Sequence, residues 1–339
     1  MTLYLILLAV MNNELFAKLH AEGLLSEDSF QKIKQHQANR LFSLHWEIKT
    51  LLYLGVLLLT GGLGILVYKN IDTIGHQVIL LFIALVCIGS FYYCFKSKLP
   101  FSTGRVVSPN VFFDYLLLLG CLSFIIFIGY LQYQYNVFGD RYGLASFIPM
   151  LLLFFSAYYF DHLGVLSMGI TNLAAWMGIT VTPLQILKAN DFNCGTIILT
   201  GFLLGVLLNA AALLTYKKNL KRHFGFTYTN FGMHIIFISC LAALFHFENA
   251  YLQWVLFLAI ISWYFYLKAM ADKSFYFILV TTLYTYIGIS YVFIRLLDMM
   301  GSFGMGSLYL GIIYFISSAI GLVLFLIKMN KKIKTHDRI

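Results

Sequence analysis

Residues 196–215 read TIILTGFLLGVLLNAAALLT, twenty consecutive residues without a charged side chain. An α-helix rises about 1.5 Å per residue, so a stretch of this length can cross a hydrocarbon core of ~30 Å. Polar and apolar residues do not alternate along it, which argues against a strand of a lipid-facing β-barrel. The stretch therefore predicts a membrane-spanning helix, because a helix satisfies its own backbone hydrogen bonds within lipid.

Nine further apolar runs are separated from this one and from each other by short polar or charged segments. The ten runs are 50–68, 77–95, 113–132, 143–160, 163–182, 196–215, 230–247, 250–267, 275–294 and 307–327. The composition agrees, because 60% of the 339 residues are hydrophobic and 11% are charged, whereas soluble domains have about 45–50% and about 25%. We predict an all-α protein, a polytopic transmembrane helix bundle of about ten spans, with membrane lipid as its partner.

The positive charges fall in alternate connections between these runs. With the N-terminus in the cytoplasm, all but four of the 23 Lys and Arg lie on the cytoplasmic side; the exceptions are Lys69, Arg141, Lys188 and Arg295. Cytoplasmic loops of membrane proteins carry such an excess. The pattern predicts an even number of spans, eight to ten, with both termini in the cytoplasm. The net charge of +9 is thereby explained as a determinant of topology, and we expect no nucleic-acid partner.

The first 48 residues differ from the rest in their pattern of polar and apolar residues. Residues 1–10 are apolar but too short to span, and translation from Met1 or from Met11 remains open. Residues 12–48 predict an amphipathic helical hairpin in the cytoplasm, either a docking or regulatory module or a unit that packs on itself or on the bundle. The predicted domains are the N-terminal segment 1–48, the bundle 49–328 and a basic cytoplasmic tail 329–339.

Two stretches in this part carry a family resemblance, LFAKLHAEGLLSEDSFQKI at 15–33 and LLYLGVLLLTGGLGILVYKNID at 51–72. They resemble the start of a family of bacterial predicted membrane proteins, domain of unknown function 2157, over about residues 12–95. The matching positions are Gly23, Leu24, Leu25, Ser26, Gly55, Gly61, Gly62, Gly64, Asn70 and Asp72, whereas Ile71 stands where the family has Trp. The resemblance implies a multi-pass protein of the bacterial inner membrane and supplies no activity.

Every Asp, Glu, Lys and Arg falls outside the runs or within a turn of their ends, so the polar residues deep within them are neutral. Asn172, Asn209 and His234 are candidates for the lining of a substrate path. The alternative is that they form hydrogen bonds between helices, each worth about 0.6 kcal/mol. Thr281 and Thr282 are interpreted in the second way.

Small residues in the quoted run indicate close helix packing. Gly201, Gly205 and Asn209 recur every four residues and share one helix face. Such a face allows two backbones to approach closely, and Asn209 is placed to form a hydrogen bond across the contact. We predict a helix-packing role for the two glycines, within the bundle or between two copies.

No catalytic motif is found, and the sequence does not decide whether the protein is an enzyme. We expect no catalytic residues, no cofactor and no bound metal. The adjacent pair Asp161–His162 is interpreted as a solvated turn, because neighbouring residues of a helix do not face each other. The five cysteines lie in apolar stretches without a CxxC motif and are expected to be small buried hydrophobes.

The favoured function is a transporter-like or scaffold bundle for a neutral or lipidic solute. Two alternatives remain. One is an integral membrane enzyme that acts on lipid-linked substrates at the cytoplasmic rim, beside Asp161 and His162. The other is a membrane sensor that uses the N-terminal hairpin.

Overall fold

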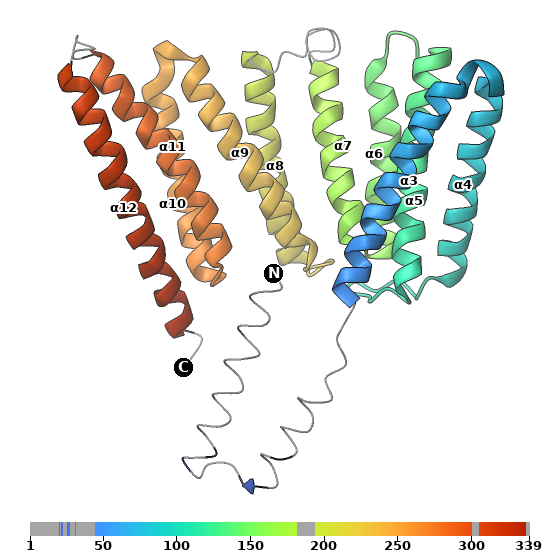
Figure 1. The fold of residues 1–339 in the computed structure, drawn as a ribbon, viewed down its shortest axis with the longest axis horizontal. Helices are drawn as coiled ribbons and strands as arrows, with labels where there is room; N and C mark the ends of the chain where they lie inside the picture. The colour runs from blue at the N-terminus through green and yellow to red at the C-terminus, as the bar shows by residue number, and fades with distance from the viewer. Residues whose placement is uncertain are drawn as a thin grey trace. The chain divides into compact units, whose positions relative to one another are not determined.

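The computed structural model describes residues 20, 22, 26, 27, 31, 45–181, 194–299 and 305–336, and these are predominantly helical. The elements are α3 (His45–Ile74), α4 (His76–Ser97), α5 (Val111–Tyr135), α6 (Tyr142–Phe160), α7 (Leu163–Val181), α8 (Gly195–Lys218), α9 (Phe224–His246), η2 (Glu248–Ala250), α10 (Tyr251–Ala271), α11 (Phe275–Met299) and α12 (Met305–His336). Figure 1 shows the long helices with consecutive ones antiparallel. The prediction of an all-α fold is confirmed.

Each of the ten predicted runs falls on a separate helix. Nine helices of the described chain, α4 to α12, are long and apolar enough to cross a membrane, whereas α3 has a shorter apolar stretch, Thr50–Ile65. The protein is thus a membrane protein with several apolar helices, as the composition predicted.

The chain divides into two compact units, residues 1–59 and 60–339. Most of the predicted hairpin 12–48 lies outside the described residues. Within the first unit, the Nε2 atom of His20 lies 2.7 Å from a carboxylate oxygen of Glu27. In the second unit, α12 continues as a helix to His336, so the predicted tail is helical up to that residue.

Polar residues in the left-handed conformation end several of the helices. Asn136 (φ 47°) follows α5, Asp161 (φ 59°) follows α6 and Asn219 (φ 52°) follows α8. Asn and Asp tolerate this conformation better than other residues with a side chain. At the other end of α5, the side chain of Asn110 accepts a hydrogen bond from the Phe113 amide at 2.7 Å, as an N-cap. These residues fix where the short connections turn.

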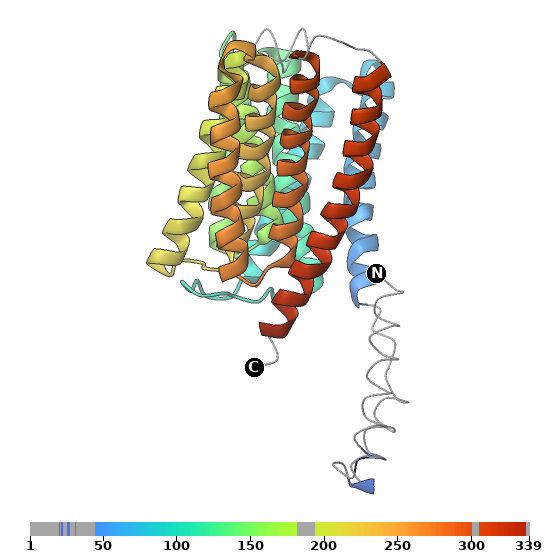
Figure 2. The same ribbon diagram turned by 90° about the vertical axis from the view of Figure 1, so that its left-hand side faces the viewer.

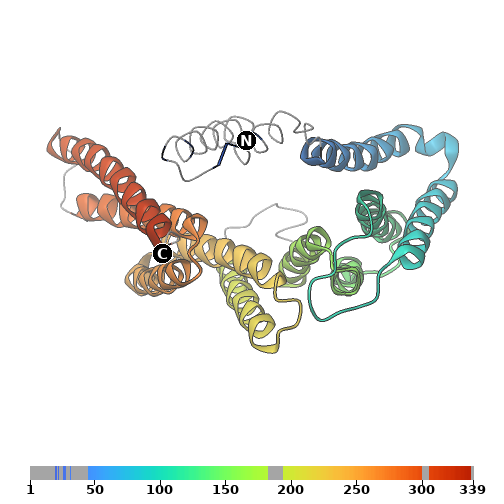
Figure 3. The same cartoon turned by 90° about the horizontal axis from the view of Figure 1, so that it is seen from below.

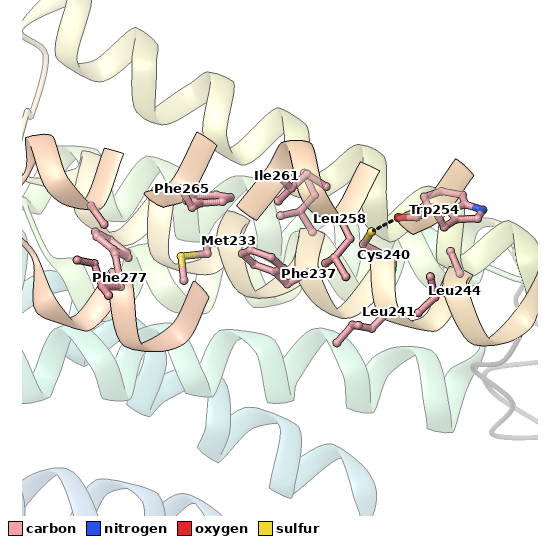
Figure 4. Close-up of a cluster of buried hydrophobic side chains, with 14 of the residues drawn as sticks. Met233, Phe237, Cys240, Leu241, Leu244, Trp254, Leu258, Ile261, Phe265 and Phe277 are labelled. Carbon is pink, nitrogen blue, oxygen red and sulfur yellow. Dashed lines mark hydrogen bonds between the residues drawn. The ribbon is translucent and has the colours of Figure 1, made fainter. Parts of the chain in front are cut away.

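The helices of the second unit pack mainly in consecutive pairs, α4 with α5, α6 with α7, α8 with α9 and α10 with α11. Helix α9 is the most buried of the apolar helices. Its side chains and those of α10 form a hydrophobic core cluster that includes Phe237, Cys240, Leu258 and Phe265 (Figure 4). The thiol of Cys240 donates to the backbone oxygen of Trp254 over 3.6 Å.

One end of the second unit holds most of the Lys and Arg residues that lie in the described connections between its helices. We call this the basic end and define it by residues 98–110, 161–162, 219–223 and 272–274. It lies at the bottom of Figure 1, and Figure 3 shows it from below, with the connection 98–110 next to the connection between α8 and α9. The amide of Lys221 donates to the backbone oxygen of Thr103 at 2.7 Å, which joins these two connections.

Helix α12 contacts its neighbours through one narrow stripe. Figure 2 shows α12 inclined relative to the other helices. Apart from Asn330, the less exposed residues of α12 recur every three or four positions; they are Gly311, Tyr314, Ser318, Leu322, Leu326, Met329 and Ile333. Met329 and Ile333 are buried in the core cluster near the basic end. The middle of the stripe is partly polar, and there the packing leaves an open space.

Candidate functional site

A groove of about 740 Å³ runs between α10, α11 and α12. Small-molecule sites in proteins typically occupy about 300–1,000 Å³. The groove is lined by Ala259, Ser262, Trp263, Tyr266, Thr281, Thr282, Thr285, Tyr286, Ile289, Tyr314, Ser318, Gly321, Leu322 and Phe325. More than half of these residues carry a hydroxyl group and none is charged. We call this space the hydroxyl groove.

Within α11, two threonines of the groove form hydrogen bonds to their own helix. The hydroxyl of Thr282 donates to the Ile278 oxygen at 2.7 Å, and that of Thr285 donates to the Thr281 oxygen at 2.7 Å. Ser and Thr in apolar helices commonly satisfy their donor in this way. The hydroxyl oxygens remain able to accept.

Pairs of hydroxyl groups also join the three helices. Ser262 on α10 lies 2.7 Å from Thr285 on α11, and Tyr286 on α11 lies 3.1 Å from Ser318 on α12. Because the hydroxyls of Thr285 and Ser318 already donate to carbonyl groups of their own helices, they act as the acceptors in these pairs. Ser262 and Tyr286 are therefore the donors.

Thr281 differs from the other hydroxyl residues of the groove. Thr281 is one of the lining residues, only 6% of it is exposed, and its buried Oγ1 atom has no hydrogen-bond partner among the described residues. Buried hydroxyl groups in proteins almost always have a partner, since an unpaired one costs about 1–3 kcal/mol. A ligand in the groove would supply the missing partner.

A second polar group lies on the face of α11 that is turned to α9. Nδ1 of His234 is 2.9 Å from the Tyr284 hydroxyl, and Nε2 is 3.0 Å from the Tyr276 hydroxyl, which donates to Oδ1 of Asn230 at 2.8 Å. Since Tyr276 donates to Asn230, it accepts from Nε2 of His234, and Nδ1 then accepts from Tyr284. The chain of bonds is complete with a neutral histidine.

The three residues predicted to line a substrate path are not brought together in one lining. Asn209 faces α9 from α8, where its amide would meet a side chain at Gly232, whereas His234 faces α11 from the opposite side of α9. Asn172 is on α7, with its amide nitrogen buried and without a hydrogen-bond partner among the described residues. None of the three lines the hydroxyl groove.

Gly201 and Gly205 lie where α8 packs most closely on α9. A Cβ atom at Gly201 would be 2.5 Å from the Ser239 hydroxyl, and one at Gly205 would be 2.8 Å from the Ile236 backbone nitrogen. The Asn209 amide donates to the Gly205 oxygen of its own helix at 2.8 Å, and among the described residues it forms no bond across the contact to α9. The Asn209 side chain is buried where α8 packs on α9, and its acceptor is the backbone oxygen one helical turn earlier.

At the basic end, Asp161 is at the centre of an ionic cluster with Lys221 and His223. One carboxylate oxygen of Asp161 lies 3.0 Å from the Lys221 ammonium and 2.5 Å from the Val106 amide. The other lies 2.5 Å from Nε2 of His223. The side chain of Asp161 is 1% exposed and that of Lys221 is 0% exposed. The expectation of a solvated turn at Asp161–His162 is therefore wrong, because the connections 98–110 and 219–223 cover it.

His162 turns away from Asp161 and toward α5. Its Nδ1 atom accepts a hydrogen bond from the Val165 amide at 3.1 Å, which places the ring proton on Nε2. Nε2 lies 3.7 Å from a carboxylate oxygen of Asp114, and both side chains are largely buried. Lys221 and Asp114 are about 50 or more positions away in the chain from Asp161 and His162, so no local sequence pattern indicates these pairings.

Part of the chain is similar to a known family. Residues 17–166 match the family model described as "Predicted membrane protein (DUF2157)". The resemblance inferred from about residues 12–95 is thereby confirmed, and the DUF2157 match extends further, through Asp114, Asp161 and His162. No curated protein and no solved structure matches the chain. The hydroxyl groove lies outside the DUF2157 match.

Proposed function

We propose that this protein is a transporter-like membrane protein that binds a neutral lipidic ligand in the hydroxyl groove. The observation that carries the proposal is the groove itself, a space of about 740 Å³ lined by hydroxyl and apolar side chains without a charged residue. Thr281 supports it, because its buried hydroxyl has no partner within the described chain.

The position of the groove favours a ligand that comes from the bilayer. The lining residues of α11 run from Thr281 to Ile289, away from both ends of the helix (Phe275–Met299), so in a membrane they would lie within the hydrocarbon core. A charge at that depth costs about 2.5–3.5 kcal/mol or more. A neutral head group avoids this cost, and lipid chains fit the apolar part of the lining.

We also propose the orientation in which the basic end faces the cytoplasm of a bacterial cell and the protein lies in the inner membrane. The support is the clustering of Lys and Arg in the connections at that end, which agrees with the general rule for membrane topology. The domain division into residues 1–48, 49–328 and 329–339 and the hairpin in the first of these remain part of the proposal.

The ionic cluster gives little support to an enzyme at the rim. Both carboxylate oxygens of Asp161 accept hydrogen bonds or pair with Lys221, and Nδ1 of His162 accepts from a backbone amide. A general base needs a free acceptor that is within reach of its substrate. The arrangement favours a structural role, in which Asp161 holds the connections of the basic end together.

Photolabelling in phosphatidylcholine nanodiscs tests the proposal. The probes are two neutral lipids with a diazirine in the acyl chain, a diacylglycerol and a fatty-acid methyl ester. We expect crosslinks on peptides of α10, α11 and α12 that excess unlabelled lipid displaces. Gly321→Trp should abolish most of this labelling, because the indole would occupy the groove and a Cβ at Gly321 meets no atom within 4 Å.

The matched control is Ile320→Trp, since Ile320 is 57% exposed and is not a lining residue. It should label as the wild type does. Labelling that spreads evenly over all lipid-exposed helices, or that is the same in both tryptophan variants, would show that the groove is not a binding site.

A further inference from the structure

We infer that the ligand of the hydroxyl groove is a lipid alcohol, a long-chain lipid such as a diacylglycerol that carries a free hydroxyl group. The inference rests on the proposed function and deepens it, because it follows from which hydrogen-bonding positions of the groove are already occupied.

Most of the hydroxyl donors in the lining are already used. Thr282 and Thr285 donate to carbonyl oxygens of α11, and Ser318 donates to the Phe315 oxygen of α12 at 3.3 Å. Ser262 donates to Thr285 and Tyr286 to Ser318, as the directions of those bonds require. The lining therefore has few hydrogens left for a ligand that only accepts.

The lining has more hydrogen-bond acceptors that are unused than donors that are unused. A hydroxyl oxygen has two lone pairs, and the oxygens of Ser262, Thr282 and Tyr286 are not the acceptor in any of the bonds described. A ligand that donates a hydrogen bond can use these oxygens. An ester or ether head group cannot use them, because it has no hydrogen to donate.

Thr281 supplies the complementary group. Its hydroxyl is the one buried in the lining without a partner in the described residues, so it can donate to a ligand oxygen. A lipid hydroxyl accepts one hydrogen bond and donates another, and it thus fits both the free donor of Thr281 and the free acceptors around it. A ligand carbonyl would accept from Thr281 but would leave the acceptor oxygens around it unused.

A phosphate or carboxylate head group does not fit. The lining contains no Lys, Arg or His, so a buried anion would lose its water without gaining a cationic partner. This restricts the class to uncharged lipids, and the hydrogen-bond pattern restricts it further to those with a hydroxyl group.

The test compares two photoprobes that differ by one methyl group, a diazirine-bearing diacylglycerol and its O-methyl ether, in phosphatidylcholine nanodiscs. In the wild type we expect the alcohol to label α10–α12 with an apparent affinity about five- to tenfold above that of the ether, the effect of one net hydrogen bond. Thr281→Val, which keeps the shape and removes the hydroxyl, should weaken labelling by both probes by a similar factor of about five to ten, because the oxygen of either probe accepts from Thr281. Thr171→Val on α7 is the control, because the exposed Thr171 donates to its own helix and does not line the groove.

Equal labelling by alcohol and ether in the wild type would overturn the inference and leave the proposed function in place. Unchanged labelling by both probes in Thr281→Val would also overturn it. Labelling of α10–α12 by neither probe would remove the proposed function and the inference together. The comparison of the two probes on the wild type needs no variant, so it holds even if Thr281→Val is not stable.

Discussion

Asp161→Asn is expected to lower the free energy of unfolding by about 3–5 kcal/mol. Asn has nearly the same size as Asp, and it also tolerates the left-handed conformation of this position, at φ 59°. It removes the charge that pairs with Lys221, whose side chain is fully buried. An unpaired buried ammonium group is far more costly than the loss of an exposed ion pair. The thermal transition of the purified protein in detergent, followed by tryptophan fluorescence, measures the effect.

A double-mutant cycle separates this explanation from a general loss of packing. Lys221→Met alone should also be strongly destabilising, whereas the double variant with Asp161→Asn should be more stable than either single variant, because no unpaired charge remains. The control is Lys217→Met, an exposed lysine of the same segment, with an expected change within about 0.5 kcal/mol. Additive effects of Asp161→Asn and Lys221→Met would contradict the proposed pairing.

Gly205→Val is expected to have an effect of similar size on the pairing of α8 with α9. A Cβ at Gly205 would lie 2.7 Å from the Cβ of Ile236 and 2.8 and 2.9 Å from its backbone nitrogen and Cα. Because two of these atoms belong to the backbone, a change of rotamer cannot relieve the contact. We expect a loss of about 3 kcal/mol or more, at the upper end for an overpacked core.

The same measurement on Gly129→Val is the control, because a Cβ at Gly129 of α5 meets no atom within 4 Å. Gly129→Val should unfold at nearly the same temperature as the wild type. If Gly205→Val behaves as Gly129→Val does, α8 and α9 do not pack at the distance described here.

The membrane-spanning helices could be predicted from the sequence because their signal is local. The run 196–215 is apolar throughout, and its length alone matches the thickness of a bilayer. The connections between the helices are short, so the charged residues in them lie close to the helix ends. The connection at Asp161–His162, only two residues long, was predicted correctly as a boundary between helices for this reason.

The environment of Asp161 could not be predicted in the same way. Its two charged partners, Lys221 and His223, are about 60 positions further along the chain, within a run of basic residues typical of a solvated connection. Nothing in that run distinguishes Lys221 from its exposed neighbours Lys217 and Lys218. Which lysine becomes buried depends on how the connection 98–110 packs over it.

The sequence does not predict the hydroxyl groove, for a different reason. Its pattern marks Thr281 and Thr282 as polar residues within a span and favours a packing role for both. That interpretation agrees with Thr282, which donates to its own helix, and does not account for Thr281, whose hydroxyl has no partner among the described residues. Adjacent residues of a helix point in different directions, and the sequence alone does not show which neighbouring helix each threonine meets.

An experimental structure of the protein in nanodiscs that contain a diacylglycerol tests the central claim most directly. We predict lipid density in the groove between α10, α11 and α12, with the head-group oxygen within about 3.2 Å of Oγ1 of Thr281. A groove closed by protein side chains, or one that holds lipid chains while Thr281 has no polar partner, would contradict the claim.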